Sequence, residues 1–209
     1  MPLKNRQVEI RNYLKDLNKE NVRENILKGL TKTPKQISSR FFYDKKGSEL
    51  FEKITKLKAY YPSEIEKKML STVLNKLDLD FHDLSIIELG SGDASKISLL
   101  FQQLAPEVLK NITYYPVDVS HTAIEKSAKR VLSRFPLKSV VGIVADFTQQ
   151  MHEISIDGRK LICFFGSTIG NFSKEKTNQL MQKIGSKMNE GDCLLMGADI
   201  IKEKAVMEA

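Results

Sequence analysis

The sequence contains no tryptophan, only two cysteines and three histidines, and no apolar run of the roughly 18 to 20 residues that a membrane span requires. Cys163 and Cys193 each lie inside an apolar run, so we expect two buried thiols and neither a disulfide nor a metal pair. His82, His121 and His152 lack the spacing of metal ligands. The charged N-terminus lacks the apolar core of a signal peptide, so we expect a cytoplasmic protein without a membrane partner.

The net charge of +7 is unevenly distributed along the chain. Residues 1–70 hold 17 Lys and Arg against 9 Asp and Glu, a net charge of +8, and the remainder is nearly neutral. A basic segment of this kind can bind nucleic acid. Its basic residues alternate with acids, however, and form no block of like charge, which favours a solvated helical face. We therefore expect no nucleic-acid partner.

The N-terminal third has the apolar spacing of helices. The stretches "VEIRNYLKDL" (8–17) and "NVRENILKGL" (21–30) place apolar residues three and four positions apart. Residues 31–57 begin as a loop and end in a short amphipathic helix. These patterns predict a helical N-terminal segment over residues 1–78, which we expect on the substrate side of the protein.

The stretch "YYPSEIEKKMLSTVLNKL" (60–77) contains a helix-start signal. Ser63 and Glu66 have the spacing of a capping box, in which the two side chains bond to each other's backbone N–H groups. A helix is therefore predicted to begin just after Pro62.

From residue 85 onward, short apolar runs alternate with helical patterns. The predicted strands are residues 85–89, 112–119, 139–147, 160–168 and 192–200. These runs look buried on both faces, as parallel strands are. The alternation predicts an α/β fold over residues 79–209, a doubly wound and mostly parallel sheet preceded by the helical segment. In such sheets, ligands bind beyond the carboxyl ends of the strands.

Polar residues follow four of the predicted strands at that edge. The stretch "ELGSG" (88–92) ends the first strand, Asp118 ends the second, Asp146 ends the third, and "GSTIGN" (166–171) follows the fourth. Because the carboxyl ends of parallel strands lie at one edge, these residues form a constellation suited to a nucleotide.

The glycine spacing distinguishes between nucleotide classes. A dinucleotide fingerprint requires a third glycine, but residue 95 is Ser95, and the acid Asp93 in the loop is poorly suited to a pyrophosphate. The sequence has no phosphate-binding loop of the G-x-x-x-x-G-K-[ST] type. A nucleoside without phosphates fits better, and S-adenosylmethionine is the cofactor that we predict.

Each polar residue has a role in this hypothesis. Asp118 would accept from the ribose diol, Asp146 from the adenine amine, and the backbone at Phe147 would meet the adenine ring. Gly90 and Gly92 would let the chain approach the methionine moiety. Each residue also has an ordinary explanation: E-x-G-x-G is common, Asp118 fits a helix cap, and Asp146 could simply end a strand.

Several stretches, taken together and in order, resemble one family. They are "FFYDKKGSELFEKITKLKAYYPSEIE", "IELGSGDASK", "YPVDVS", "VADF", "FFGSTIGNF" and "GDCLLMGADIIKEK". From about residue 28 to the last residue the chain resembles the histidine-specific methyltransferases, which use S-adenosylmethionine. Their best-known members trimethylate the α-amino group of histidine in ergothioneine biosynthesis. The resemblance implies a Rossmann-like class I methyltransferase fold.

The resemblance also implies roles for individual residues. The positions that match the family's cofactor residues are Gly90, Lys96, Asp118, Asp146 and Phe147. Tyr60 matches a residue that contacts the amino-acid substrate, and Asn171 matches the residue that orients its α-amino group. Without the resemblance, Tyr60 would be read as a packing aromatic and Asn171 as a turn residue. No residue is expected to act as a covalent or acid–base catalyst, because the reaction is a direct displacement that depends on alignment.

Two other functions remain open on the sequence: a nucleic-acid methyltransferase, and a cofactor-binding remnant without catalysis. Members of the family continue beyond the position that matches Ala209, so the resemblance implies a C-terminally truncated chain with part of the histidine site missing. The last predicted strand would then be an apolar sheet edge through which the chain could dimerise.

Overall fold

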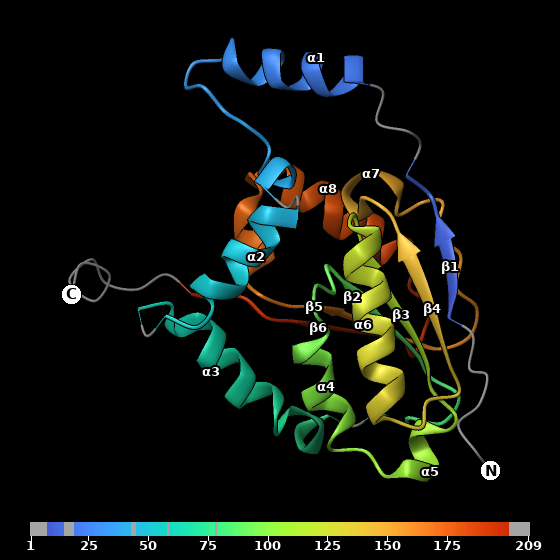
Figure 1. Cartoon of the computed structure of the whole chain (residues 1–209). Helices are drawn as coiled ribbons and strands as arrows, with labels where there is room; N and C mark the ends of the chain where they lie inside the picture. Colours follow the sequence, from blue (N-terminus) through green and yellow to red (C-terminus); the bar gives the residue numbers. More distant parts are fainter. Residues whose placement is uncertain (1–7, 15–18, 43–44, 58, 78, 201–209) are drawn as a thin grey trace.

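The computed structural model describes residues 8–14, 19–42, 45–57, 59–77 and 79–200. These residues form one sheet of six strands, all of them parallel (Figure 1). The strands are β1 (Glu9–Asn12), β2 (Ser85–Leu89), β3 (Thr113–Asp118), β4 (Ser139–Val144), β5 (Lys160–Phe164) and β6 (Cys193–Met196). Their order across the sheet is β1-β4-β3-β2-β5-β6. The five strands predicted from the sequence are thus confirmed, the first with the predicted bounds and the other four with shorter ones.

Helices cover both faces of the sheet. The helices in the described residues are α1 (Lys19–Leu30), α2 (Lys45–Ile54), α3 (Tyr61–Leu70), α4 (Ser95–Phe101), α5 (Pro106–Leu109), α6 (His121–Arg134), α7 (Phe147–Gln150) and α8 (Lys174–Gly185), and α1 stands apart from the sheet (Figure 1). Short 3-10 helices span Ser39–Phe42, Val73–Lys76 and Thr168–Asn171. On one face, α4 and α6 pack with the end of α3, and on the other face lies α8. No helix in the described part of the chain is long and apolar enough to cross a membrane.

The two faces of the sheet bury separate apolar clusters because successive strand residues point to opposite sides. In β5, Cys163 joins the cluster beneath α4 and α6, whereas Ile162 and Phe164 join the cluster beneath α8. Cys163 is fully buried and Cys193 half-buried, both as free thiols. Burial raises the pKa of the Cys163 thiol well above its usual value.

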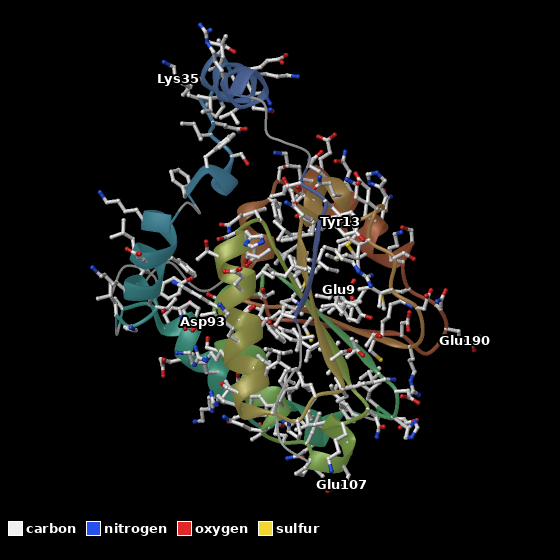
Figure 2. All side chains as sticks on the ribbon, turned by 45° about the vertical axis from the view of Figure 1, so that its right-hand side comes forward. Glu9, Tyr13, Lys35, Asp93, Glu107 and Glu190 are labelled. Atoms are coloured by element: carbon white, nitrogen blue, oxygen red, sulfur yellow. The ribbon has the colours of Figure 1, made fainter. Side chains whose placement is uncertain are left out.

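The prediction of a helix over residues 8–17 is wrong for residues 8–14, and residues 15–17 lie outside the described part of the chain. Residues 9–12 are β1, which pairs in parallel with β4 from Glu9 opposite Val141 to Asn12 opposite Val144. Val8 packs against one apolar cluster and Tyr13 against the other. Because β4 would otherwise end the sheet with unpaired backbone groups, pairing there outweighs the weak helical pattern of this stretch. Figure 2 shows Glu9 and Tyr13 towards opposite ends of β1.

The strand order determines where a ligand would lie. From β2 the chain crosses outward to β3 and then to β4, and it returns to the other side of β2 as β5. The order therefore reverses between β2 and β5, the position at which open parallel sheets bind ligands. In Figure 1 the arrowheads of β1 and β4 point toward the end of the sheet at which α7 lies.

Candidate functional site at the carboxyl edge of the sheet

The turn after β2 is built from glycines in a left-handed conformation. Gly90 has φ 71° and Gly92 has φ 51°, values that L-residues rarely adopt. The N–H groups of Gly90 and Ser91 both donate to the carbonyl of Val117, at 2.8 and 3.1 Å, which ties the turn to β3. A Cβ atom added to Gly92 would meet no atom within 4 Å. The turn is thus fixed to the sheet on one side and open on the other.

Asp118 lies against this turn, as predicted. Its Oδ2 accepts from the N–H of Gly92 at 3.1 Å and its Oδ1 from the N–H of Ser120 at 2.9 Å. Burial raises the pKa of the Asp118 carboxyl, although the backbone hydrogen bonds oppose the rise. Ser120, and not Asp118, is the side-chain cap of α6, because its Oγ accepts from the N–H of Ala123 at 3.2 Å. The carboxylate therefore has a position defined by two strand-end loops.

Asp146 and Phe147 follow β4. Asp146 caps α7, since its Oδ1 accepts from the N–H and the Oγ1 of Thr148, at 3.0 and 2.6 Å. The Phe147 ring packs edge-to-face on Phe164, with centroids 5.5 Å apart. A Cβ on Gly90 would lie 3.9 Å from Phe147, so this ring faces the glycine turn. The structure thus brings the residues predicted to hold the adenine beside those predicted to hold the methionine end.

Asn171 ends the turn that follows β5. Gly166 and Ser167 take positive φ values of 83° and 52°, and the 3-10 helix Thr168–Asn171 follows, with the Asn171 side chain exposed. The turn is fastened to the end of β6, because the N–H of Ser167 donates to the carbonyl of Gly197 at 3.2 Å. Asn171 therefore belongs to the same edge as the glycine turn.

Tyr60 comes from outside the sheet, directly before α3. It is half-buried, and its ring contacts Phe51 of α2 edge-on, with centroids 6.2 Å apart. The predicted capping box is wrong: α3 begins at Tyr61, no side chain caps it, and the buried Ser63 hydroxyl has no hydrogen-bond partner. Pro62 sits in the first turn, where its missing N–H costs nothing.

Glu66, which the sequence pattern assigned to that cap, instead reaches the site. Its Oε2 lies 2.6 Å from Nζ of Lys96, and its Oε1 accepts from the N–H of Gly166 at 2.7 Å. One carboxylate thus joins α3 to the first turn of α4 and to the loop after β5. Neither partner is near Glu66 in the sequence, so no local signal indicates the contact.

The carboxyl of Glu88, in the strand that leads into the glycine turn, is buried. Glu88 of β2 is 2% exposed and accepts from the Tyr114 hydroxyl at 2.5 Å. Burial raises the pKa of Glu88 to about 8, against the Tyr114 hydrogen bond and the charge of Lys96, which lower it. Asp93 in the loop has its own partner, Arg130 of α6, at 2.8 Å, and Figure 2 shows it beside that helix.

The residues at this edge fit a nucleoside better than a nucleotide. Asp118 supplies an acceptor in a fixed position, and Asp93, although paired with Arg130, places a carboxylate in the loop where a pyrophosphate would need donors. Within the described ranges, only two buried side-chain oxygens lack a partner, and one of them is the Ser91 hydroxyl in the glycine turn. An unsatisfied hydroxyl there is expected where a ligand completes the hydrogen bonding.

Comparison with known proteins identifies the family of the chain. Residues 22–209 match the sequence profile of the histidine-specific, S-adenosylmethionine-dependent methyltransferases. The chain is 32% identical over 200 residues to a histidine N-alpha-methyltransferase of Mycobacterium tuberculosis, covering 95% of this chain and 62% of that protein. A protein of the same name from Mycolicibacterium smegmatis is 30% identical, with 94% and 61% covered. The chain thus spans about three fifths of the length of these relatives.

More distant similarities point the same way. A 4-dimethylallyltryptophan N-methyltransferase of Aspergillus fumigatus is 27% identical, over 77% of this chain and 49% of that protein. A putative S-adenosyl-L-methionine-dependent methyltransferase of Methanococcus maripaludis shares the fold, with a TM-score of 0.51 and 19% identity over 74% of this chain and 64% of that one. The predicted Rossmann-like fold is confirmed, and the chain belongs to the histidine-specific S-adenosylmethionine-dependent methyltransferase family.

Proposed function

We propose that the chain is an S-adenosylmethionine-dependent N-methyltransferase that acts on the α-amino group of histidine or a related amino acid. The observation that supports it most is the Asp118 carboxylate, held against an open glycine turn at the point where the strand order reverses. The family match supports the cofactor, and the two mycobacterial relatives support histidine as the substrate.

The cofactor residues divide the edge into three parts. Asp118 would accept from the ribose hydroxyls, Asp146 from the adenine amine, and Phe147 would cover the adenine ring. Gly90 and Gly92 would leave room for the methionine end, with Lys96 beyond them. The bound cofactor supplies a methyl group on a positively charged sulfur, and the residues of this chain would orient it.

The amino-acid substrate would lie between the start of α3 and the loop after β5. Tyr60 can donate a hydrogen bond to the substrate carboxylate. Asn171 is neutral, so it can hold an amine without favouring the protonated form, which has no lone pair for attack. The N-terminal segment 1–78 would then form the substrate side and 79–209 the cofactor side, with β1 as the one strand that the described residues of the first segment contribute to the sheet.

We also propose that the outer edge of β6 pairs with another chain in a dimer. Among the described strands, β6 pairs with β5 alone, and Met196 is 42% exposed. Charged side chains usually protect an exposed strand edge, but β6 has the sequence CLLM.

Two measurements test the proposed function. Calorimetric titration with S-adenosylhomocysteine should give saturable binding, and NADH should give none. Incubation with S-adenosylmethionine and histidine, followed by mass spectrometry, should then show methylated histidine, whereas RNA in the same assay should remain unmodified. Binding without methylation of any amino acid would reduce the function to cofactor binding. Tight binding of NADH would contradict the proposal that S-adenosylmethionine is the cofactor.

A further inference from the structure

The Glu66–Lys96 ion pair is shielded from water. Its side chains are 14% and 20% exposed, whereas in the Glu64–Lys67 pair on the outer side of α3 they are 70% and 36% exposed. A partly buried pair loses much of the hydration of both charges, and only Glu66 makes a further hydrogen bond, from the Gly166 N–H, whereas Lys96 Nζ has Glu66 as its single partner among the described residues. Its placement at the ligand edge therefore calls for an explanation other than stability.

Two glycines leave room for this pair. A Cβ on Gly166 would lie 2.8 Å from Nζ of Lys96, and a Cβ on Gly197 would overlap the Glu66 carboxylate. Both charges therefore lie directly against the backbone at the ends of β5 and β6. The Ser63 hydroxyl, one turn before Glu66 on the same side of α3, is the other buried side-chain oxygen without a partner in the described ranges.

We propose that Glu66 and Lys96 together bind the zwitterionic amino-acid end of the cofactor, Glu66 its α-ammonium and Lys96 its α-carboxylate. Opposite charges on the protein match opposite charges on the ligand, so the complex stays neutral at this place. Glu66 keeps its bond to Gly166 N–H, and the remaining acceptor positions on the carboxylate serve the ammonium. This assignment rests on the proposed function and adds Glu66 to the binding residues.

The position of Lys96 favours the cofactor over the substrate, which is also an amino acid. Lys96 is the second residue of α4, which follows the glycine turn. Gly92 of that turn donates its N–H to the Asp118 carboxylate. If the ribose of the cofactor binds at Asp118, its methionine end would lie along the turn, toward Lys96 and Glu66.

The test compares two ligands that differ only at this end: S-adenosylhomocysteine, and 5′-methylthioadenosine, which lacks the amino acid. Glu66→Gln keeps an acceptor for Gly166 and removes the charge, so it should weaken S-adenosylhomocysteine binding by about tenfold or more, since a hydrogen bond to a charged group is lost. Binding of methylthioadenosine should be unchanged, which also shows that the variant is folded. Glu64→Gln on the same helix is the matched control and should change neither affinity.

The outcomes separate the alternatives. Equal loss for both ligands would mean that Glu66 only supports the fold, and no loss for either would mean that the cofactor does not touch it; both overturn the assignment. If only histidine binds more weakly and S-adenosylhomocysteine binding is unaffected, then Glu66 and Lys96 bind the substrate and not the cofactor, and the assignment is also overturned. A wild-type chain that binds neither adenosine ligand would refute the proposed function itself, and this assignment with it.

Discussion

The buried carboxyl of Glu88 makes the stability of the fold depend on pH. The side chain is 2% exposed and its pKa is raised from 4.5 to about 8, chiefly by burial. Between these values the folded chain holds a proton that the unfolded chain has released. Stability from this group is therefore fully present below pH 4.5 and is lost as the pH rises toward 8 and above.

The size of the loss follows from the pKa difference. Each unit is worth about 1.4 kcal/mol, so the loss reaches about 3 kcal/mol by pH 7 and about 5 kcal/mol above pH 9. Glu88→Gln cannot ionise and keeps an oxygen for the Tyr114 hydroxyl at the same place. The variant should therefore lack this pH dependence while preserving the contact.

Urea denaturation at pH 5 and pH 8 measures the effect. The free energy of unfolding of Glu88→Gln minus that of the wild type should become more positive by about 3 kcal/mol between these pH values. Glu64→Gln, a substitution at an exposed site, should show no such change and serves as the control. A difference that stays constant with pH would show that Glu88 titrates normally in the folded chain.

Three further substitutions test other parts of the structure. Asp118→Ala should weaken S-adenosylhomocysteine binding by about 1 to 3 kcal/mol, because it leaves polar partners unpaired; equal calorimetric affinities would remove the ribose assignment. The Lys160 side chain is 5% exposed, and its ammonium lies 2.9 Å from the Asp192 carboxylate, so Asp192→Asn leaves a buried charge without a counter-charge. The free energy of unfolding, measured in urea, should fall by about 3 to 5 kcal/mol. An unchanged urea midpoint would contradict this. Met196→Lys places a charge on the outer strand and should abolish self-association in sedimentation experiments, and a dimer that survives it must use another surface.

The sheet could be predicted from the sequence because parallel strands are buried on both faces. The runs SIIEL and KLICF are apolar enough to stand out, and all their residues are buried. Once the strands are known to be parallel, Asp118 and Asp146 must lie at one edge, and the structure agrees. The order of the strands, in contrast, depends on pairing between distant segments that no local pattern encodes.

The errors concern residues whose partners are far away. The strand Glu9–Asn12 is only half-buried and too short for its alternation to compete with a helical reading. Ser63 and Glu66 fit a local capping box, but Glu66 gains more from Lys96 and Gly166, whose positions only the folded sheet provides. A carboxylate near the start of a helix is therefore ambiguous until the tertiary contacts are known.

The pairing of β1 has a consequence for folding during synthesis. Of the described strands, β1 leaves the ribosome first, but its partner Val141 follows Glu9 by about 130 residues, which takes roughly 7 to 26 seconds at about 5 to 20 residues per second. The segment must therefore wait unpaired until β4 has been made and has joined β3. β1 can therefore pair with the sheet only after β4 has been synthesised. A nascent chain that is halted before residue 139 would leave β1 unpaired and accessible to chaperones and proteases.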